Sequence, residues 1–184
     1  MSAPKVDQLP TTDREIAVVG RSNVGKSSLI NAIANRTGLA HVSKTPGRTQ
    51  LINLFEVASG VSVVDLPGYG YAKVPGRIRQ QWGPMIEGYL LGREQLRMVM
   101  VLIDGEIGPT KLDIQMLDWL RQNEIPHQVI ATKSDKVKSN KKPARRKELA
   151  AGCMLEPGDV LWVSAAKGIN IDRLQDLIRS WLSP

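Results

Sequence analysis

A glycine-rich loop between a short apolar strand and a helix limits this chain more than any other feature. Residues 15–20 (EIAVVG) predict a buried strand and residues 26–35 predict a helix, and Gly20–Ser27 between them matches G-x-x-x-x-G-K-[ST]. Glycines let such a backbone curl so that its N–H groups point at phosphate oxygens, and the helix adds its positive N-terminal end. We therefore expect a phosphate-binding loop on an α/β fold; the alternative is a glycine-containing turn on an unrelated α/β fold.

The remainder of the chain alternates between strand and helix patterns. Further strands are predicted at residues 51–57, 61–65, 98–104, 128–132 and 160–164, and further helices at 77–91, 112–120, 141–151 and 171–182, the last with Asn170 as N-cap. Such alternation predicts a mainly parallel sheet covered on both faces, with ligands at the carboxyl ends of its strands. The short link after residue 57 makes 51–57 and 61–65 antiparallel neighbours. We expect a three-layer α/β domain with a six-stranded, mostly parallel sheet and one antiparallel edge pair.

Length and composition set the class of protein. The 184 residues fit one domain over residues 1–184, with residues 1–13 expected to be a flexible N-terminal extension. Hydrophobic residues make up 42% of the chain, enough for a core, and no apolar run is long enough to cross a bilayer. The N-terminus lacks the apolar stretch of a secretory signal, and the single cysteine, Cys153, excludes an internal disulfide. We expect a cytoplasmic protein with no membrane partner, and a monomer.

The net charge of +7 is concentrated in one short segment. Outside residues 136–147 the acidic and basic residues balance, so this segment carries the whole excess. Such a patch indicates contact with a polyanion such as RNA, and the alternative is a solvated helix face. The candidate RNA contacts are Lys136, Lys138, Lys141, Lys142, Arg145, Arg146 and Lys147.

Two strand ends carry residues suited to phosphate and metal. In the glycine-rich loop, Lys26 is placed to reach the β- and γ-phosphates and the Ser27 hydroxyl to ligate Mg²⁺. Asp65 ends a buried strand and is expected to hold Mg²⁺ through a water molecule, while Gly68 leaves its N–H free for a γ-phosphate. Alone, the Asp65–Gly68 pattern is also typical of a strand-end turn.

Two later strand ends carry residues suited to a guanine base. Asp135, in the sequence TKSD, is able to accept hydrogen bonds from guanine N1–H and the 2-amino group, a pair that adenine does not offer. The Lys133 stem is expected along the base face, and Val163–Ala165 is expected to offer a backbone N–H to guanine O6. By itself TKSD is more often a solvated turn, so the prediction depends on its position at this strand end.

The stretches GRSNVGKS, DLPG, TKSD and VSA resemble the G1, G3, G4 and G5 boxes of TRAFAC-class, Ras-like GTPases. EIAVVGRSNVGKSSLINAI, SKTPGRTQLINLFEV, DLPGYGYAKV and TKSDK are similar to the EngB/YihA/YsxC family of bacterial ribosome-biogenesis GTP-binding proteins, over residues 9–182. The resemblance implies a Ras-like P-loop NTPase fold, binding of GTP and GDP, and slow GTP hydrolysis. It also implies a role in assembly of the large ribosomal subunit, through its rRNA and proteins, and a link to normal cell division and septation.

Site residues follow at the matching positions. The resemblance implies that Thr49 closes on Mg²⁺ and the γ-phosphate, so that Ser27, Thr49 and Asp65 (through water) serve the metal and Lys26, Thr49 and Gly68 serve catalysis. Asn23 stands where potassium-activated relatives carry an asparagine that ligates K⁺. The residues expected to contact the nucleotide are Gly20, Arg21, Ser22, Asn23, Val24, Gly25, Lys26, Ser27, Ser28, Gly47, Arg48, Thr49, Gln50, Leu51, Asp65, Leu66, Pro67, Gly68, Thr132, Lys133, Ser134, Asp135, Val163, Ser164 and Ala165.

Two residues depart from the family pattern, and two other functions remain as alternatives. Thr132 replaces the asparagine of most Ras-like proteins, which weakens an expected contact to guanine N7, and Tyr69 stands where Ras-type proteins carry a water-orienting glutamine. One alternative is a P-loop kinase for a small metabolite, although no lid insertion is visible. The other is an rRNA-binding module in which the nucleotide is a structural ligand, although Lys26, Ser27, Thr49 and Asp65 are all present.

Overall fold

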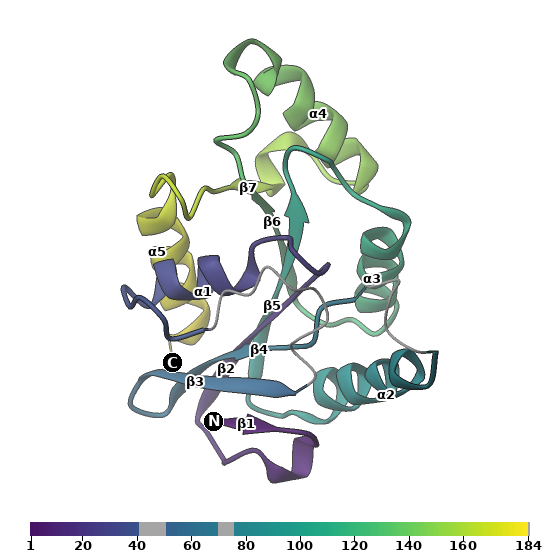
Figure 1. Ribbon diagram of the computed structural model, residues 1–184, viewed down its shortest axis with the longest axis vertical. Coiled ribbons are helices and arrows are strands. Elements are labelled where there is room, and N and C mark those ends of the chain that lie inside the picture. Colours follow the sequence, from purple (N-terminus) through teal and green to yellow (C-terminus); the bar gives the residue numbers. More distant parts are fainter. Residues whose placement is uncertain (41–50, 70–75, 184) are drawn as a thin grey trace.

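The computed structural model describes residues 1–40, 51–69 and 76–183, with side chains described outside residues 76–82. Over these residues one sheet runs through the protein with helices on both faces (Figure 1). The strand order is β1-β3-β4-β2-β5-β6-β7; β1 and β4 pair antiparallel to β3, and all other pairs are parallel. The strands are β1 (Ser2–Ala3), β2 (Arg14–Gly20), β3 (Ile52–Ala58), β4 (Val61–Asp65), β5 (Leu96–Asp104), β6 (His127–Thr132) and β7 (Leu161–Trp162).

The helices follow the strands in alternation. They are α1 (Lys26–Ile33), α2 (Gly76–Gly92), α3 (Lys111–Gln122), α4 (Lys142–Gly152) and α5 (Ile171–Leu182), with short 3₁₀ turns η1 (Val6–Gln8), η2 (Ser139–Lys141) and η3 (Pro157–Asp159). The period of two along a strand divides the core between the two faces of the sheet. In β2, Ile16 and Val18 pack with residues of α1 and α5, whereas Ala17 and Val19 pack with residues of α2, α3 and α4.

The predicted α/β fold, with a mostly parallel sheet and an antiparallel pair formed by β3 and β4, is confirmed. The predicted count of six strands is wrong, because Ser2 and Ala3 add β1 to the edge of the sheet beside β3. Within residues 1–13, expected to be a flexible extension, the first three residues contact the sheet: Ala3 is buried, and the amine of Met1 donates to the Leu54 carbonyl at 2.8 Å. A two-residue strand is too short to produce a periodic signal, which is why the sequence did not reveal it.

The last strand and the last helix differ in detail from the prediction. The strand expected at 160–164 is limited to Leu161–Trp162, because the chain turns back so that Ser164 and Ile169 exchange backbone hydrogen bonds at 3.0 Å. Asn170 occupies the N-cap position of α5 but does not cap it. Its side-chain Nδ2 donates to the Trp162 carbonyl at 2.7 Å instead, which ties the start of α5 to β7.

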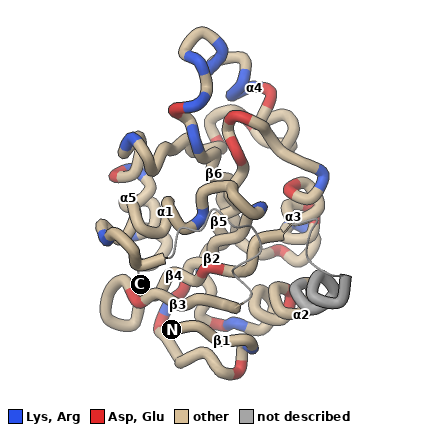
Figure 2. Tube along the Cα trace, in the orientation of Figure 1, with Lys and Arg blue, Asp and Glu red and all other residues tan. Residues whose placement is uncertain are grey.

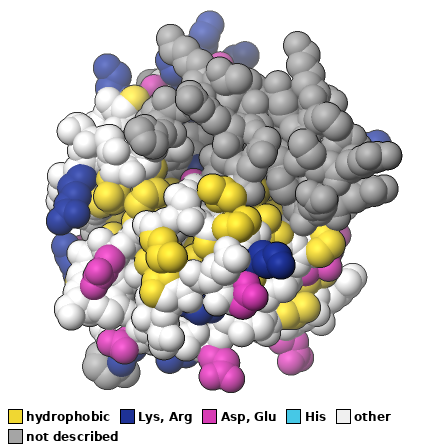
Figure 3. All heavy atoms as spheres, turned by 60° about the horizontal axis from the view of Figure 1, so that its bottom comes forward, with side chains coloured by type: hydrophobic (Ala, Val, Ile, Leu, Met, Phe, Trp, Pro, Cys, Tyr) yellow, Lys and Arg dark blue, Asp and Glu magenta, His cyan; other side chains and the backbone are white. Residues whose placement is uncertain are grey.

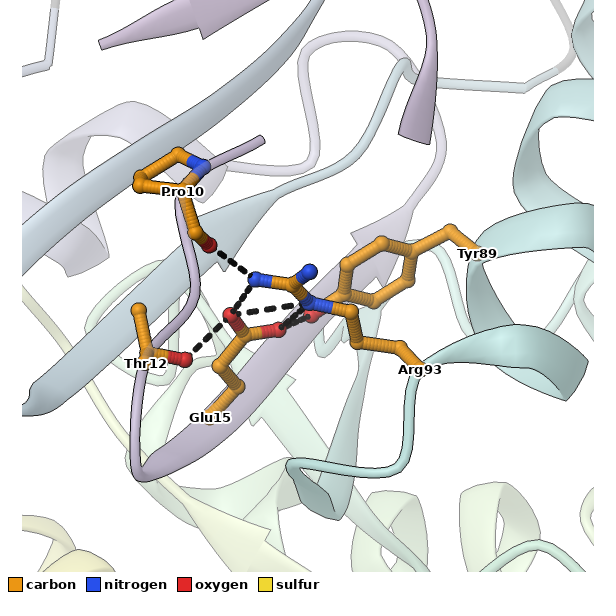
Figure 4. A network of polar contacts seen from close by, with 5 residues as sticks. All are labelled: Pro10, Thr12, Glu15, Tyr89 and Arg93. Atoms are coloured by element: carbon orange, nitrogen blue, oxygen red, sulfur yellow. Dashed lines mark hydrogen bonds and ion pairs between the residues drawn. The ribbon is translucent and has the colours of Figure 1, made fainter. Parts of the chain in front are cut away.

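A buried ionic cluster ties α2 to the first residues of β2 (Figure 4). Glu15 is fully buried; it accepts hydrogen bonds from Tyr89 Oη at 2.6 Å, from Thr12 Oγ1 at 2.6 Å and from Arg93, whose Nη2 lies 2.6 Å from Oε1. Arg93 also donates to the Pro10 carbonyl. Burial alone raises the pKa of Glu15, but the hydrogen bonds from Arg93, Thr12 and Tyr89 outweigh it and hold that pKa below its ordinary value.

We predict that Glu15→Gln destabilises the fold by roughly 3 kcal/mol at neutral pH, because it leaves the nearly buried Arg93 without its charge partner. Since the folded-state pKa lies below the ordinary 4.5, the ionised carboxylate stabilises the fold above pH 4.5, and this stabilisation disappears as the pH falls through the lower folded-state value. Urea unfolding at neutral and acid pH measures the effect. The deficit of Glu15→Gln should shrink in acid, and Asp176→Asn, which breaks an exposed pair with Arg179, should change little at either pH. A deficit that is the same at both pH values would contradict this account.

Candidate nucleotide-binding site

The loop from Gly20 to Lys26 joins the end of β2 to the start of α1. Two of its residues, Asn23 (φ 65°) and Gly25 (φ 106°), adopt left-handed backbone conformations that curl the loop. At Gly20 a side chain has no room, because a Cβ atom would lie 2.9 Å from Val24 Cγ1 and 3.0 Å from the Leu102 carbonyl oxygen. The glycines of the sequence pattern are thus required by local packing as well as by backbone conformation.

The structure brings Lys26, Asp65 and Gly68 together beside this loop. Parallel pairing of Val18 with Asp65 ends β4 next to β2, and Lys26 Nζ lies 3.6 Å from Asp65 Oδ1 with both side chains nearly buried. A Cβ atom at Gly68 would lie 3.2 Å from Ser22 N and 3.3 Å from Lys26 Nζ. Any residue other than glycine at this position would therefore displace its neighbours. The lysine ammonium therefore lies close to both the Asp65 carboxylate and the backbone at Gly68.

Asp65 fits a role as metal partner. Its Oδ1 atom is buried, and no hydrogen bond to it is found among residues 1–40, 51–69 and 76–183. Burial raises the pKa of this carboxyl, and the nearby Lys26 ammonium opposes the shift. A buried carboxylate oxygen without a hydrogen-bond donor is typical of a ligand-binding group, and Mg²⁺ takes carboxylate, hydroxyl and water oxygens. Together with Ser27 in the first turn of α1, Asp65 supplies oxygen atoms of the kind that this ion requires.

The loops after β6 and β7, which the sequence predicts to bind the base, contact each other. Ser164 Oγ donates to Asp135 Oδ1 at 2.5 Å, and Ser134 N donates to the Val163 carbonyl at 3.1 Å. The hydrogen bond from Ser164 lowers the pKa of Asp135 against the opposing effect of burial, so the carboxylate is ionised at neutral pH. An ionised carboxylate fixed at one oxygen keeps acceptor capacity for two ligand N–H groups.

Thr132 connects the two halves of the site. Its hydroxyl donates to the Val24 carbonyl of the glycine-rich loop at 2.7 Å and also lies 3.2 Å from the Ile103 carbonyl. The sequence suggested only that threonine weakens a contact to guanine N7. The structure assigns the hydroxyl a different partner, because β6 ends beside the glycine-rich loop and a short side chain there reaches its backbone.

Two acidic residues near the site escaped the sequence analysis. Asp104, the last residue of β5, accepts a hydrogen bond from Lys133 Nζ at 2.7 Å, and Asp113 in α3 accepts one from Tyr69 Oη at 2.8 Å. Burial and the Asp113 charge hold the pKa of Tyr69 well above its usual range, so its hydroxyl stays protonated and donates. Asp104 carried one available signal, since it ends a predicted strand next to the one that ends at Thr132.

Five of the predicted nucleotide contacts lie just before β3. Gly47, Arg48, Thr49 and Gln50 lie outside the described residues. Leu51 directly precedes β3 and is 38% exposed.

The basic segment 136–147 forms the projecting end of α4 together with η2, where Lys and Arg gather (Figure 2). Its arginines contact the protein itself: Arg145 Nε donates to the Gly105 carbonyl at 3.1 Å, and Arg146, although exposed, has its Cζ over the Trp162 ring, 6.0 Å from the ring centre. Four of its lysines, Lys136, Lys138, Lys141 and Lys147, are exposed. The face turned forward in Figure 3, in contrast, carries charges of both signs among hydrophobic side chains.

Searched over the described part of the chain, no helix has the length and apolar character that a membrane span requires.

Comparison with known proteins gives concordant results. A family model described as "50S ribosome-binding GTPase" matches residues 15–133. The "Probable GTP-binding protein EngB" of Geobacter sulfurreducens is 49% identical over 151 residues, covering 82% of this chain and 73% of the relative. Its counterpart from Clostridium acetobutylicum is 52% identical over 148 residues, covering 80% and 74%.

Solved structures share the fold. The crystal structure of a probable GTP-binding protein engB superposes with a TM-score of 0.72 at 23% identity, over 91% of this chain and 97% of that one. The structure of a point variant of Aquifex aeolicus Era bound to GDP·AlF₄⁻ gives a TM-score of 0.74 at 22% identity, over 92% of this chain and 57% of that one.

Proposed function

Because the chain belongs to the EngB family of GTP-binding proteins, with a Ras-like GTPase fold, we propose that it is a GTP-hydrolysing switch in assembly of the large ribosomal subunit. The observation that carries the nucleotide part is the convergence of Lys26, Asp65 and Gly68 at the glycine-rich loop, with the Asp135–Ser164 pair at the adjoining strand end. By the same family resemblance, the proposal extends to a supporting role in normal cell division and septation.

The residues at the glycine-rich loop divide the work on the phosphates. The loop N–H groups and the start of α1 bind the phosphate chain, and Lys26 neutralises charge on the β- and γ-phosphates. Gly68 is expected to present its backbone N–H to the γ-phosphate, a contact that is lost when hydrolysis removes this phosphate. Ser27, Thr49 and, through water, Asp65 would hold Mg²⁺, which supplies positive charge against the phosphates.

The structure gives a reason to expect slow hydrolysis. Tyr69, at the position of the water-orienting glutamine of Ras-type proteins, points its hydroxyl at Asp113 in α3, and its carbonyl accepts the Ser22 N–H at 3.1 Å. With both polar groups engaged, Tyr69 positions Gly68 rather than an attacking water. We propose that the missing group comes from the ribosomal particle, a protein partner or a monovalent cation.

The proposed ribosomal partner is supported by the family description and by charge. RNA presents a dense array of phosphates, and exposed lysines bind them as mobile point charges with counterion release. Lys136, Lys138, Lys141 and Lys147 are exposed. The segment that carries them belongs to the projecting end at α4 where Lys and Arg gather (Figure 2), which suits contact with a large polyanionic particle.

Asp135→Asn should weaken GTP binding and improve binding of xanthosine triphosphate. The asparagine amide donates a hydrogen bond, so it pairs with the carbonyl of xanthine and not with the N–H donor that guanine offers at the same position. A buried pair of this kind contributes up to ~10⁴-fold to discrimination. Fluorescence titration of both nucleotides measures it, with Asp176→Asn as a control that makes the same chemical change in an exposed pair of α5. An unchanged GTP affinity in Asp135→Asn would refute the proposed base pocket.

Alanine at Lys138, Lys141, Lys142 and Lys147 should weaken binding to large-subunit particles and flatten its salt dependence. Each lost phosphate contact removes roughly one unit from the log–log salt slope. Arg145 and Arg146 are kept because they contact Gly105 and Trp162. Co-sedimentation with a GTP analogue, with GDP and without nucleotide measures the effect and tests the proposed function as a whole.

The matched control for this variant removes the same charge elsewhere, at the exposed residues Lys5, Arg36, Lys111 and Arg173. Both variants should bind GTP like the parent. If both lose ribosome affinity equally, net charge and not the α4 end determines binding.

Turnover should be faster in KCl than in NaCl at equal ionic strength, by about tenfold, if Asn23 helps to hold K⁺ against the phosphates. This is well below the ~10³–10⁵ that an arginine finger supplies. The left-handed conformation of Asn23 places an amide at the bend of the loop. Asn23→Ala should abolish the difference between the salts, and equal rates of the parent in both salts, with and without ribosomal particles, would exclude the ion.

A further inference from the structure

We propose that Asp104 is a positioning residue for guanine recognition: its carboxylate fixes the Lys133 ammonium and thereby holds the Lys133 stem in place for the base. The proposal rests on the guanine pocket proposed above for residues 132–135. Asp104 is not part of any of the sequence motifs that predicted the site.

Asp104 and Lys133 form a direct ion pair, and their side chains differ in how exposed they are. Lys133 Nζ lies 2.7 Å from Asp104 Oδ2, and the Asp104 side chain is 2% exposed whereas that of Lys133 is 36% exposed. Parallel pairing of β5 with β6 sets Asp104 beside Thr132, so the carboxylate is built into the sheet edge one residue from Lys133. A buried anchor thus holds a partly exposed side chain at the rim of the pocket.

The anchor is itself held from the other side. Asp104 Oδ1 accepts the backbone N–H groups of Glu106 at 2.9 Å and Ile107 at 3.2 Å. The carbonyls of Gly105 and Glu106 in turn accept hydrogen bonds from Arg145 of α4. Both carboxylate oxygens are engaged, so the group is oriented before any ligand arrives, and only Oδ2 is directed to Lys133.

The loop that follows Asp104 is also packed tightly against the end of β6, where residues 132–135 begin. A Cβ atom at Gly105 would lie 2.6 Å from the Thr132 carbonyl oxygen and 2.7 Å from the Trp162 ring, so the chain passes here only as glycine. Asp104 therefore cannot shift relative to Thr132 and Lys133 unless the backbone at Gly105 moves away from the Thr132 carbonyl and the Trp162 ring.

Lys133 needs such an anchor for two reasons. Its backbone is left-handed, at φ 56°, a conformation that non-glycine residues keep where surrounding contacts impose it. Its side chain has four rotatable bonds, and ordering them on ligand binding opposes affinity. An ion pair that orders the stem in the free protein removes part of that penalty, which is a gain in nucleotide affinity without a contact between Asp104 and the nucleotide.

The test uses Asp104→Asn in the full chain. Asparagine keeps an oxygen for the N–H groups of Glu106 and Ile107 but loses the negative charge that faces Lys133. GDP affinity, from titration with a fluorescent GDP analogue, should fall about tenfold, in the range of a lost charged hydrogen bond. The ratio of GDP to IDP affinity should not change, since Asp135 reads the base edge, and Asp176→Asn should leave both affinities at the parental value.

A double-mutant cycle separates positioning from a purely structural role. Lys133→Met removes the ammonium but keeps an apolar stem, so Asp104→Asn, Lys133→Met and the double variant should all lose GDP affinity by the same factor. Losses that multiply in the double variant would show that Asp104 acts through its loop alone and would overturn the proposal. Thermal unfolding of each variant identifies any that is not folded, and Lys133→Met then tests the pair from the other side.

Lys133→Ala distinguishes failure of this inference from failure of the proposed pocket. It removes the stem as well and should weaken GDP more than Lys133→Met does. If Lys133→Ala binds GDP like the parent, the base role of Lys133 is refuted and the inference with it. If Lys133→Ala weakens GDP binding but Asp104→Asn does not, the pocket stands and only the positioning role of Asp104 is refuted.

Discussion

The whole candidate site depends on parallel strands that end at one edge of the sheet. In-register pairs link Val18 with Asp65, Gly20 with Leu102 and Asp104 with Thr132, so the loops after β2, β4, β5 and β6 leave the sheet side by side. Each loop needs only short side chains and its own backbone to reach its neighbours. The sheet therefore determines which residues meet, and the loops determine what chemistry they present.

Hydrogen bonds between these loops turn neighbouring strand ends into one unit. Thr132, at the end of β6, donates to the Val24 carbonyl of the glycine-rich loop, and Ser22 of that loop donates to the carbonyl of Tyr69. At the opposite end of β2, Glu15 is tied to Tyr89 and Arg93 (Figure 4). The strand that leads into the glycine-rich loop is thus fixed at both ends, which suits a site whose left-handed residues need support from their surroundings.

The sequence predicted the parts of this site that local patterns encode. The glycine-rich loop and the strand-end Asp65 follow from short motifs and from strand order, and the structure places Lys26 Nζ 3.6 Å from Asp65 Oδ1. The hydrogen bond between Ser164 and Asp135 was not predicted, although both residues belong to motifs that the sequence shows. Contacts to side chains outside the short motifs were not predictable in this way. Tyr69 meets Asp113 and Lys133 meets Asp104 only because of how α3 and β5 pack, and a two-residue strand such as β1 leaves no periodic signal.

The basic segment shows why charge composition alone overstates a binding surface. Its two arginines have the planar donors that suit carbonyl and aromatic partners, and both contact the protein itself, at Gly105 and Trp162. The exposed lysines keep their ammonium groups in solvent, where they are available to a partner. Because Arg145 supports the loop that carries Asp104, α4 contributes both to the support of the base pocket and to the surface that we propose for RNA. A partner bound to α4 would thus contact the helix whose Arg145 holds the carbonyls of Gly105 and Glu106, next to Asp104.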